Sequence, residues 1–204
     1  MKNLEVKDLG LIDYNEAWQL MATKTQQKKG NEVDEVWFAE HTPVYTLGHG
    51  ASEDNIVLKN GIPVIRSDRG GQVTYHGQGQ LMIYFLLNLR RLKWGPKKLI
   101  CELEQIIINL LSQYGISSER ISGAPGIYVE NKKIASVGLK IKKGHCYHGI
   151  SLNVDMDTKP FNDIITCGIE SLEVTQVSDI VDVSMNQIKL DLINILKFRK
   201  SEAA

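Results

Sequence analysis

Apolar residues along this chain recur at helical spacing in three segments. Asp13, with Glu16 three residues later, forms a capping pattern that opens a helix, and the apolar pattern that follows fades out before Gly30. The densest apolar stripe has a proline at its start and a glycine after its end, which is typical of helix termini. The predicted helices begin after Asp13, at Gly95-Pro96 and after Ser184, and the second ends at Gly115.

Other apolar runs are shorter and have the pattern of strands. The run from Leu81 to Leu89 is apolar on both faces, as in an interior strand, and the turn Asn131-Lys132 joins two further runs into a meander. Because strands outnumber helices and join locally, the pattern predicts an α+β fold with a mixed, largely antiparallel sheet. The predicted strands cover residues 35–40, 44–47, 62–66, 81–89, 127–130, 133–142 and a run from 144 toward 154.

The segment from Asp68 to Gln80 has the composition of a binding loop. It contains four glycines together with Arg69 and His76, which is more glycine and polar chemistry than a tight hairpin requires. A phosphate cradle is disfavoured, because no G-x-x-x-x-G-K-[ST] motif is present and a strand, not a helix, follows the glycine pair.

The composition narrows the class of protein. A length of 204 residues predicts a single domain over residues 1–204, and the zero net charge argues against nucleic acid and anionic membranes as partners. Apolar runs shorter than about 20 residues and a start without a signal-peptide core predict a cytoplasmic protein that does not span a membrane.

The cysteines and histidines are the first candidates for a catalytic or metal site. The three cysteines are expected to be free thiols, and the five histidines lie outside zinc-binding frames, so no metal is expected. Cys101, on the second predicted helix, is expected to be a packing residue. The residues alone do not decide whether Cys167 is an inert loop thiol or a nucleophile, because a reactive thiol needs a cation or base nearby. Lys133, at the start of a mostly apolar strand, could point into a pocket and favour a thiolate.

Six blocks of sequence occur in the order found in lipoyl(octanoyl) transferases, which this chain therefore resembles from about residue 35 to 180. Relatives often have proline where this chain has Gln78 and Thr166, a difference that affects loop stiffness more than chemistry. The blocks are residues 40–48, 68–77, 123–126, 133–138, 148–154 and 166–168.

The resemblance implies transfer of an octanoyl group from acyl carrier protein to a specific lysine. The acceptors would be the lipoyl domains of 2-oxoacid dehydrogenases and the glycine cleavage H protein, with Cys167 as the thioester nucleophile and Lys133 lowering its pKa. No ATP or other cofactor would be needed, and the fold would be that of the biotin and lipoate protein ligases, a mixed sheet flanked by helices. The implied substrate-binding residues are Arg69, Gly70, Gly71, Gln72, Val73, Thr74, Tyr75, His76, Ser136, Val137, Gly138, Gly149, Ile150 and Ser151.

Two other functions remain compatible with the sequence. An ATP-dependent lipoate or biotin protein ligase would have the same fold but would activate the acid as an adenylate and need no cysteine. A non-enzymatic module that binds a carrier protein would use basic residues against an acidic partner. The sequence Arg69-Gly70-Gly71 together with Cys167 favours the transferase.

Overall fold

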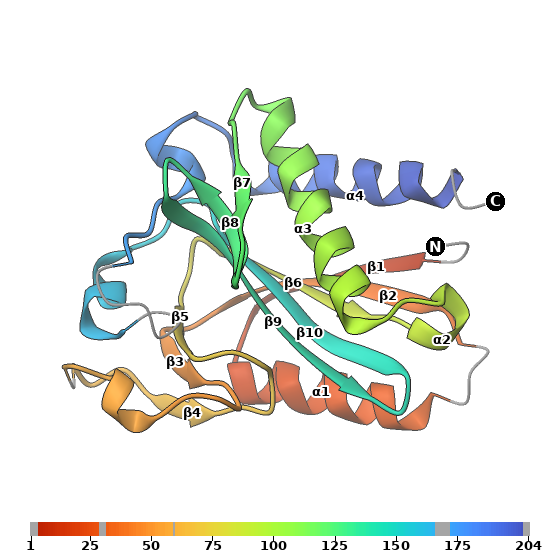
Figure 1. Cartoon of the computed structure of the whole chain (residues 1–204), viewed down its shortest axis with the longest axis horizontal. Helices are drawn as coiled ribbons and strands as arrows, with labels where there is room; N and C mark the ends of the chain where they lie inside the picture. The colour runs from red at the N-terminus through yellow and green to blue at the C-terminus, as the bar shows by residue number, and fades with distance from the viewer. Residues whose placement is uncertain (1–3, 29–31, 59, 166–171, 202–204) are drawn as a thin grey trace.

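A seven-stranded sheet forms the centre of the protein, as seen in the computed structural model, which describes residues 4–28, 32–58, 60–165 and 172–201 (Figure 1). At one edge of the sheet, the strand Leu4–Ile12 pairs in parallel with its neighbour Asp34–His41, and the other neighbouring strands pair antiparallel. The α+β prediction with a mixed, largely antiparallel sheet is therefore confirmed. In spatial order the strands are β1 (Leu4–Ile12), β2 (Asp34–His41), β6 (Gln80–Leu86), β10 (His145–Asn153), β9 (Lys132–Lys142), β8 (Ala124–Val129) and β7 (Glu119–Ile121).

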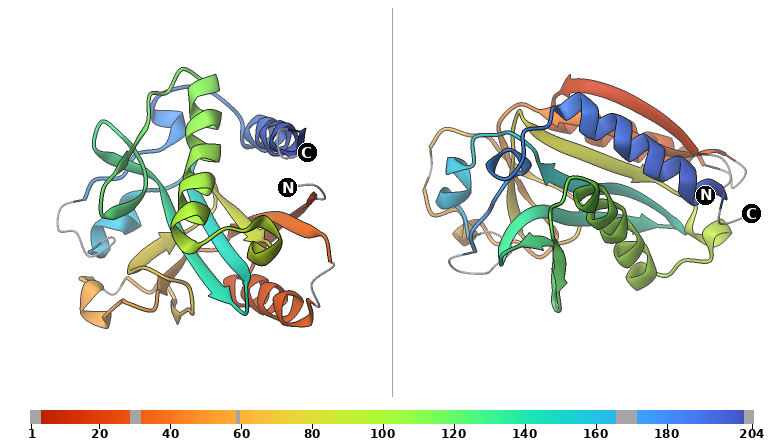
Figure 2. Two further views of the ribbon diagram at one scale, coloured as in Figure 1. Left: turned by 45° about the vertical axis from the view of Figure 1, so that its right-hand side comes forward. Right: turned by 90° about the horizontal axis from the view of Figure 1, so that it is seen from above.

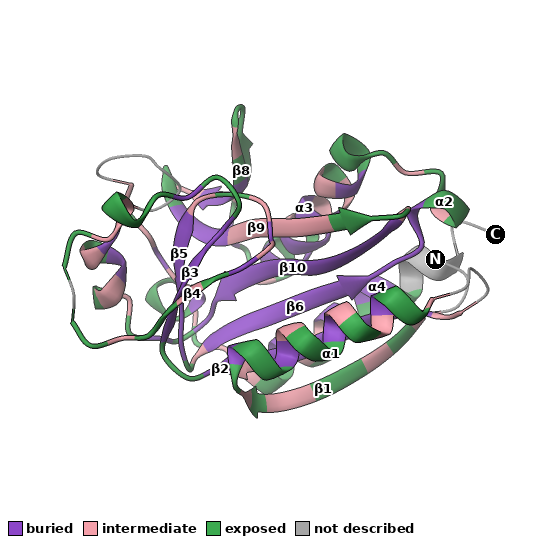
Figure 3. Cartoon of the chain, turned by 90° about the horizontal axis from the view of Figure 1, so that it is seen from below, coloured by how far each residue is buried: buried purple, intermediate pink, exposed green. Residues whose placement is uncertain are grey.

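Helices cover both faces of this sheet. On one face lies α1 (Tyr14–Gln27), and the views from above and below place α3 (Pro96–Gln113) and α4 (Met185–Ser201) on the other (Figures 2 and 3). The larger apolar cluster joins α3 and α4 to the inner strands, while a smaller one joins α1 to β2, β6 and β10. The Asp13 side chain accepts hydrogen bonds from the backbone N–H groups of Asn15 and Glu16, which confirms the predicted cap.

A three-stranded sheet lies beside the large one and carries the glycine-rich segment. It has the order β4 (Val64–Arg66), β3 (Val44–Leu47) and β5 (Val73–His76). A third apolar cluster of the protein packs on this small sheet. It includes Tyr45, Tyr75 and Phe161, the last from the 3₁₀ helix η2 (Lys159–Asp163). The other short helices are α2 (Leu89–Leu92), η1 (Glu53–Asn55) and η4 (Val177–Asp179).

The structure corrects several predicted boundaries. Strand β1 lies at the sheet edge and was not predicted. Its alternation of apolar and polar residues is interrupted between Asp8 and Leu11, where a bulge shifts the pairing with β2. Leu89 begins helix α2, whose N-cap Asn88 accepts a hydrogen bond from Arg91 N. The segment from Asp68 to Gln80, predicted as a binding loop, contains a fully buried strand, β5. In the described part of the chain, no helix is both long and apolar enough to cross a membrane.

Candidate active site

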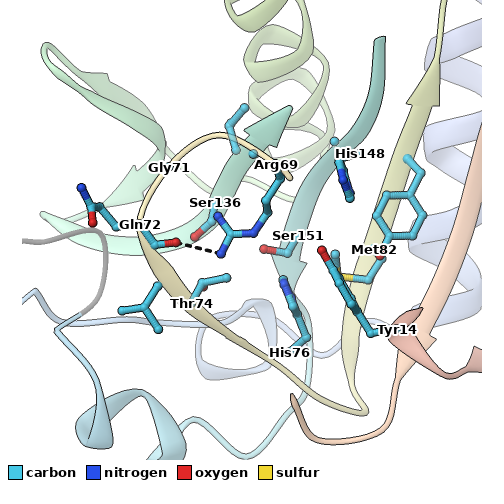
Figure 4. Close-up of a pocket in the computed structure, with 15 residues that line it drawn as sticks. Tyr14, Arg69, Gly71, Gln72, Thr74, His76, Met82, Ser136, His148 and Ser151 are labelled. Carbon is cyan, nitrogen blue, oxygen red and sulfur yellow. Dashed lines mark hydrogen bonds between the residues drawn. The ribbon is translucent and has the colours of Figure 1, made fainter. Parts of the chain in front are cut away.

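A narrow pocket opens between the small sheet, the large sheet and the start of α1 (Figure 4). Its cavity volume is about 40 Å³. Strands β9 and β10 form one wall, the segment from Arg69 to His76 forms another, and Tyr14, Met82 and Tyr84 close one end. The lining residues are Tyr14, Arg69, Gly71, Gln72, Val73, Thr74, His76, Met82, Tyr84, Ser136, Val137, Gly138, His148, Gly149 and Ser151.

The wall from β9 and β10 is built from cross-strand pairs. Ser136 lies opposite Ser151, and Gly138 lies opposite Gly149, so the antiparallel register brings two distant segments to the same pocket. A Cβ atom at Gly149 would lie 1.9 Å from the carbonyl oxygen of Ile83, and one at Gly138 would lie 3.0 Å from Arg69 Cδ. Glycine at these positions allows the neighbouring strand and the Arg69 side chain to approach closely.

Arg69 is buried and holds the glycine loop in shape. Its guanidinium donates to the carbonyl oxygens of Thr46, Gly70 and Gln72 at 2.7, 2.9 and 2.8 Å. It also donates to Thr46 Oγ1 through Nη2 at 2.8 Å. These bonds fix the loop against β3, so Arg69 maintains the shape of the pocket wall.

His76 continues this network as a neutral ring. Burial, together with His41 and Arg69, lowers the pKa of His76 well below its ordinary value. Its Nδ1 donates to Gln80 Oε1 at 2.7 Å, so Nε2 accepts from Thr46 Oγ1 at 3.1 Å. Because both ring nitrogens are bonded within the protein, the geometry favours a supporting role for His76 over proton transfer.

Aromatic rings and a carboxylate surround the end of the pocket that Tyr14 closes. The ring of Tyr14 stacks on His76 and on His148, at centroid distances of 5.7 and 6.5 Å. His148 Nε2 donates to Asp68 Oδ1 at 2.9 Å, and the Tyr147 hydroxyl donates to the other oxygen of the same carboxylate. Burial raises the pKa of Asp68, but these hydrogen bonds outweigh it and hold the pKa at about 2. Asp68 is therefore ionised at neutral pH.

Thr74 supplies a polar atom without a partner. Its Oγ1 is buried and forms no hydrogen bond within the part of the chain that the structure describes. Figure 4 shows Thr74 and Gln72 on the same side of the pocket as Ser136, away from Tyr14 and His148. Among the described residues, Thr25, Ser118 and His145 carry buried polar atoms in the same state.

A wide groove adjoins the narrow pocket and contains Lys133. Its cavity volume is about 530 Å³, and it shares Gly71, Gln72, Val137 and Gly138 with the narrow pocket. The other residues of the groove come from the glycine-rich segment, α3, the turn before β8, the start of β8, and strand β9. They are Gly70, Pro96, Ile100, Gly123, Ala124, Pro125, Lys133, Leu139 and Ile141.

The Lys133 side chain is only 2% exposed and lies over strand β8. A Cβ atom at Gly126 would be 2.5 Å from Lys133 Cε, and Lys133 Nζ lies 5.2 Å from the centre of the Tyr128 ring. The Lys133 backbone donates to Glu173 O at 2.8 Å and accepts from Thr175 N at 3.0 Å. These contacts restrict the amine at the edge of the wide groove.

Cys167 lies outside the described residues. The other two cysteines are free thiols: Cys101 is exposed, which corrects the expectation of a packing residue, and Cys146 is buried. Burial raises the pKa of Cys146 to about 12, so this thiol is protonated at neutral pH. No cluster of potential metal ligands occurs among the described histidines, cysteines and carboxylates.

The structure brings most of the expected substrate-binding residues together and separates three of them. Gly70 lines the wide groove instead of the narrow pocket. Tyr75 packs with Phe161 in the small-sheet cluster, and Ile150 packs in the main core, because alternate residues of a strand face opposite sides. The lining residues Tyr14, Met82, Tyr84 and His148 were not predicted; the alternation of Met82 and Tyr84 along β6 was the available signal.

Known sequences resemble this chain over nearly its whole length. The sequence model of the lipoyl protein ligase A/B catalytic domain matches residues 13–197. An octanoyltransferase of Vibrio cholerae serotype O1 (strain ATCC 39315 / El Tor Inaba N16961) is 47% identical over 193 residues, which cover 95% of this chain and 89% of the relative.

Solved structures agree with this fold at lower identity. Protein Ta0514 from T. acidophilum, a putative lipoate protein ligase with bound lipoic acid, has a TM-score of 0.75 and 19% identity, covering 96% of this chain and 84% of that one. The biotin protein ligase of Aquifex aeolicus has a TM-score of 0.57 and 14% identity, covering 99% of this chain and 71% of that one. Both similarities concern the fold alone.

Proposed function

The chain belongs to the family of lipoyl protein ligase A/B catalytic domains, and we propose that it is an octanoyltransferase of protein lipoylation. The donor is octanoyl acyl carrier protein in the cytoplasm. The acceptors are lysines on lipoyl domains of 2-oxoacid dehydrogenases and on the glycine cleavage H protein. The similarity to octanoyltransferases over most of the chain supports this reaction over that of an ATP-dependent ligase.

The observation that carries the proposed mechanism is the buried Lys133 amine beside a groove that continues into a closed pocket. Lys133 pairs through its backbone with residues 173–175, which follow Cys167 closely in the chain. A cation near a thiol favours the thiolate, so Lys133 acts on Cys167. The Cys167 thiolate attacks the thioester carbonyl, and backbone N–H groups stabilise the oxyanion. The bond to the carrier sulfur then breaks, and Lys133 gives its proton to the departing thiolate, which leaves the Lys133 amine neutral.

In the second half of the reaction, the acceptor lysine attacks the octanoyl thioester on Cys167. Lys133 takes a proton from the attacking amine, an amide bond forms, and the carbon–sulfur bond to Cys167 breaks. The Cys167 thiolate and the cationic Lys133 are then restored. Thioester cleavage by an amine is downhill, so the reaction proceeds without ATP.

The octanoyl chain would run from Lys133 toward the closed end of the narrow pocket. At roughly 10–15 Å³ for each water-sized group, the volume of about 40 Å³ holds only a few carbons. The narrow pocket therefore takes only the end of the octanoyl tail, near Tyr14 and Met82, and the rest of the octanoyl group with its carbonyl lies at the junction with the wide groove. Burial of the tail contributes about 0.8 kcal/mol per methylene, and Thr74 Oγ1 is available to the polar end.

Intact-mass measurement after incubation with octanoyl carrier protein, without acceptor, tests the intermediate. The wild type should gain one octanoyl group, Cys167→Ser should gain none, and the control Cys101→Ser should gain it, because Cys101 is an exposed thiol elsewhere. An adduct that persists in Cys167→Ser would refute the mechanism. Transfer that requires ATP and free octanoate would support a ligase instead.

Lys133→Ala tests the role of the amine. In a Cys101→Ser background, the Cys167 thiol pKa should rise, because the nearby cation is lost, and octanoyl transfer should fall strongly. Alkylation rates measured across pH report the thiol pKa. The matched control is Lys132→Ala, which removes an exposed neighbouring amine paired with Glu173. Unchanged alkylation across pH in Lys133→Ala would remove Lys133 from the mechanism.

A further inference from the structure

A further cavity lies at the turn between β9 and β10, beside the end of α1 (Figure 1). Its volume is about 500 Å³, and among the described residues none lines it together with the narrow pocket or the wide groove. The end of α1, the hairpin turn and α2 with its N-cap surround it. We refer to it as the basic cavity, after the basic residues in its wall. They are Lys28, Arg90, Lys142, Lys143 and His145.

The basic residues of this cavity have no acidic partner within it. In the part of the chain that the structure describes, no carboxylate lines the cavity, and no ion pair involves Arg90, Lys142 or Lys143. Two neighbouring carboxylates, Asp34 and Glu35, pair with cations outside the cavity. Because like charges repel one another, an anion in the cavity would be attracted to all of these cations and would offset their repulsion.

Backbone contacts hold two of the cations in position. The hairpin turn consists of Lys143 and Gly144, whose φ angles of 51° and 81° are both positive, and Arg90 packs against it. A Cβ atom at Gly144 would be 2.5 Å from Arg90 Nε, so glycine makes this contact possible. At the end of α1, Lys28 Nζ donates to the carbonyl oxygen of Leu86 at 2.7 Å. The guanidinium and the amine are therefore ordered before a ligand binds, which lowers the entropy cost of binding.

Two buried polar atoms in the lining have no hydrogen-bond partner among the described residues. They are Thr25 Oγ1 and His145 Nε2, and the two residues are only 6% and 9% exposed. Burial and the Lys28 cation lower the pKa of His145, despite the opposing effects of the Lys143 backbone and Glu32. The ring is therefore neutral at pH 7. A phosphate group satisfies both atoms, because its oxygens accept from a hydroxyl and its own P–OH donates to a ring nitrogen.

We propose that the basic cavity binds the phosphate group of a small phosphorylated molecule. The volume of the cavity is that of a small-molecule site, and Thr25 and His145 lie too deep for the flat surface of a protein partner to contact. Arg90 and Lys142 are exposed and provide charge-assisted hydrogen bonds to phosphate oxygens. The site is separate from the narrow pocket and does not depend on the proposed function.

Phosphate titrations at fixed ionic strength test the proposal. Inorganic phosphate and glycerol 3-phosphate should bind the wild type in isothermal calorimetry and raise its melting temperature as their concentration rises. Arg90→Gln with Lys142→Gln should raise the Kd by about tenfold or more, because charge-assisted hydrogen bonds are lost. Thr25→Val removes the buried hydroxyl with little change in shape. It should weaken phosphate binding without lowering the melting temperature of the phosphate-free protein.

The matched control is Lys97→Gln with Lys197→Gln. It removes the same charge from two exposed positions, one on α3 and one on α4, and should keep the wild-type Kd. Absence of phosphate binding by the wild type would overturn the proposal. Equal Kd values in the two double variants would overturn it as well, because nonspecific attraction to positive charge would then explain the binding.

Two further measurements separate a small molecule from larger anionic partners. Phosphatidylcholine vesicles that contain phosphatidic acid should not sediment with the wild type. Sedimentation that Arg90→Gln with Lys142→Gln abolishes would assign the cavity to a lipid headgroup and overturn the proposal. Weaker transfer from octanoyl carrier protein in that double variant, without phosphate binding by the wild type, would identify an acidic protein surface as the ligand instead.

Discussion

At the scale of single residues, Gly126 decides where the Lys133 side chain can lie. A Cβ atom at Gly126 would be 2.5 Å from Lys133 Cε, 3.2 Å from Nζ and 2.7 Å from Ala135 O, and its φ of 141° is rare for other residues. Gly126→Ala should therefore displace the amine and lower octanoyl transfer by about tenfold or more, as expected for a small misplacement of a catalytic group. Transfer rates and a thermal melt would measure both effects.

Gly115→Ala, after the end of α3, provides the matched control for this substitution. Its φ of 74° imposes backbone strain, but its Cβ would meet no atom within 4 Å. It should lose some stability and little transfer activity, because the Lys133 amine stays in place. Equal rates in the two alanine variants would show that contact between Gly126 and Lys133 does not matter for transfer.

The side chains of Cys146 and His148 do not follow the simple alternation of faces along strand β10. Alternation predicts that Cys146 and His148 share a face of the sheet. Instead, Cys146 packs in the core beside α3 and α4, while His148 stacks on Tyr14 of α1. His148 has a left-handed φ of 61°, which turns its side chain to the other face. No local sequence signal specifies this conformation.

At the scale of elements, Glu104 joins α3 to the β8 strand that supports Lys133. Its side chain is buried; Oε1 accepts from Gly126 N at 2.9 Å, and Oε2 accepts from Arg120 Nε at 3.0 Å. Glu104→Ala should cost about 2–3 kcal/mol of unfolding free energy, because a buried amide and a guanidinium lose their acceptor. Urea denaturation would measure the loss.

The neighbouring acidic residue Glu102 gives the control on the same helix. It pairs with Lys98 one turn away, and such pairs contribute only about 0.3–0.5 kcal/mol. Glu102→Ala should therefore unfold near the wild-type urea concentration. A Glu104→Ala protein as stable as Glu102→Ala would mean that the link between α3 and β8 does not stabilise the fold.

At the scale of the whole molecule, Glu35 on β2 ties together the first three elements. It accepts hydrogen bonds from Lys7 on β1 and Trp37 on β2, at 2.7 and 2.9 Å, and pairs with Lys24 on α1 at 3.0 Å. Burial raises the pKa of Glu35, but these partners outweigh it and bring the pKa to about 2. The folded protein thus binds this proton less readily than the unfolded chain.

The lowered pKa makes a prediction about acid stability. The contribution of Glu35, on the order of 2 kcal/mol, should be fully present above about pH 4.3 and lost as pH falls toward 2. Unfolding free energies measured between pH 2 and 6 should therefore decline less steeply in Glu35→Gln. Glu53→Gln, at an exposed ion pair, serves as the control. Parallel pH curves for wild type and Glu35→Gln would contradict this assignment.

The sequence by itself determined the main helices, the meander, the fold class and the family, because apolar periodicity, capping residues and ordered motifs are local signals. The family and the mixed sheet are confirmed. The roles of Cys167 and Lys133 remain predictions. Only the tertiary structure decided that Ser136 faces Ser151, that Tyr14 and Met82 close the pocket, and that Lys133 lies against Gly126. The residues in these contacts come from different strands and helices, so strand register and helix packing, which act over the whole fold, decide which of them meet.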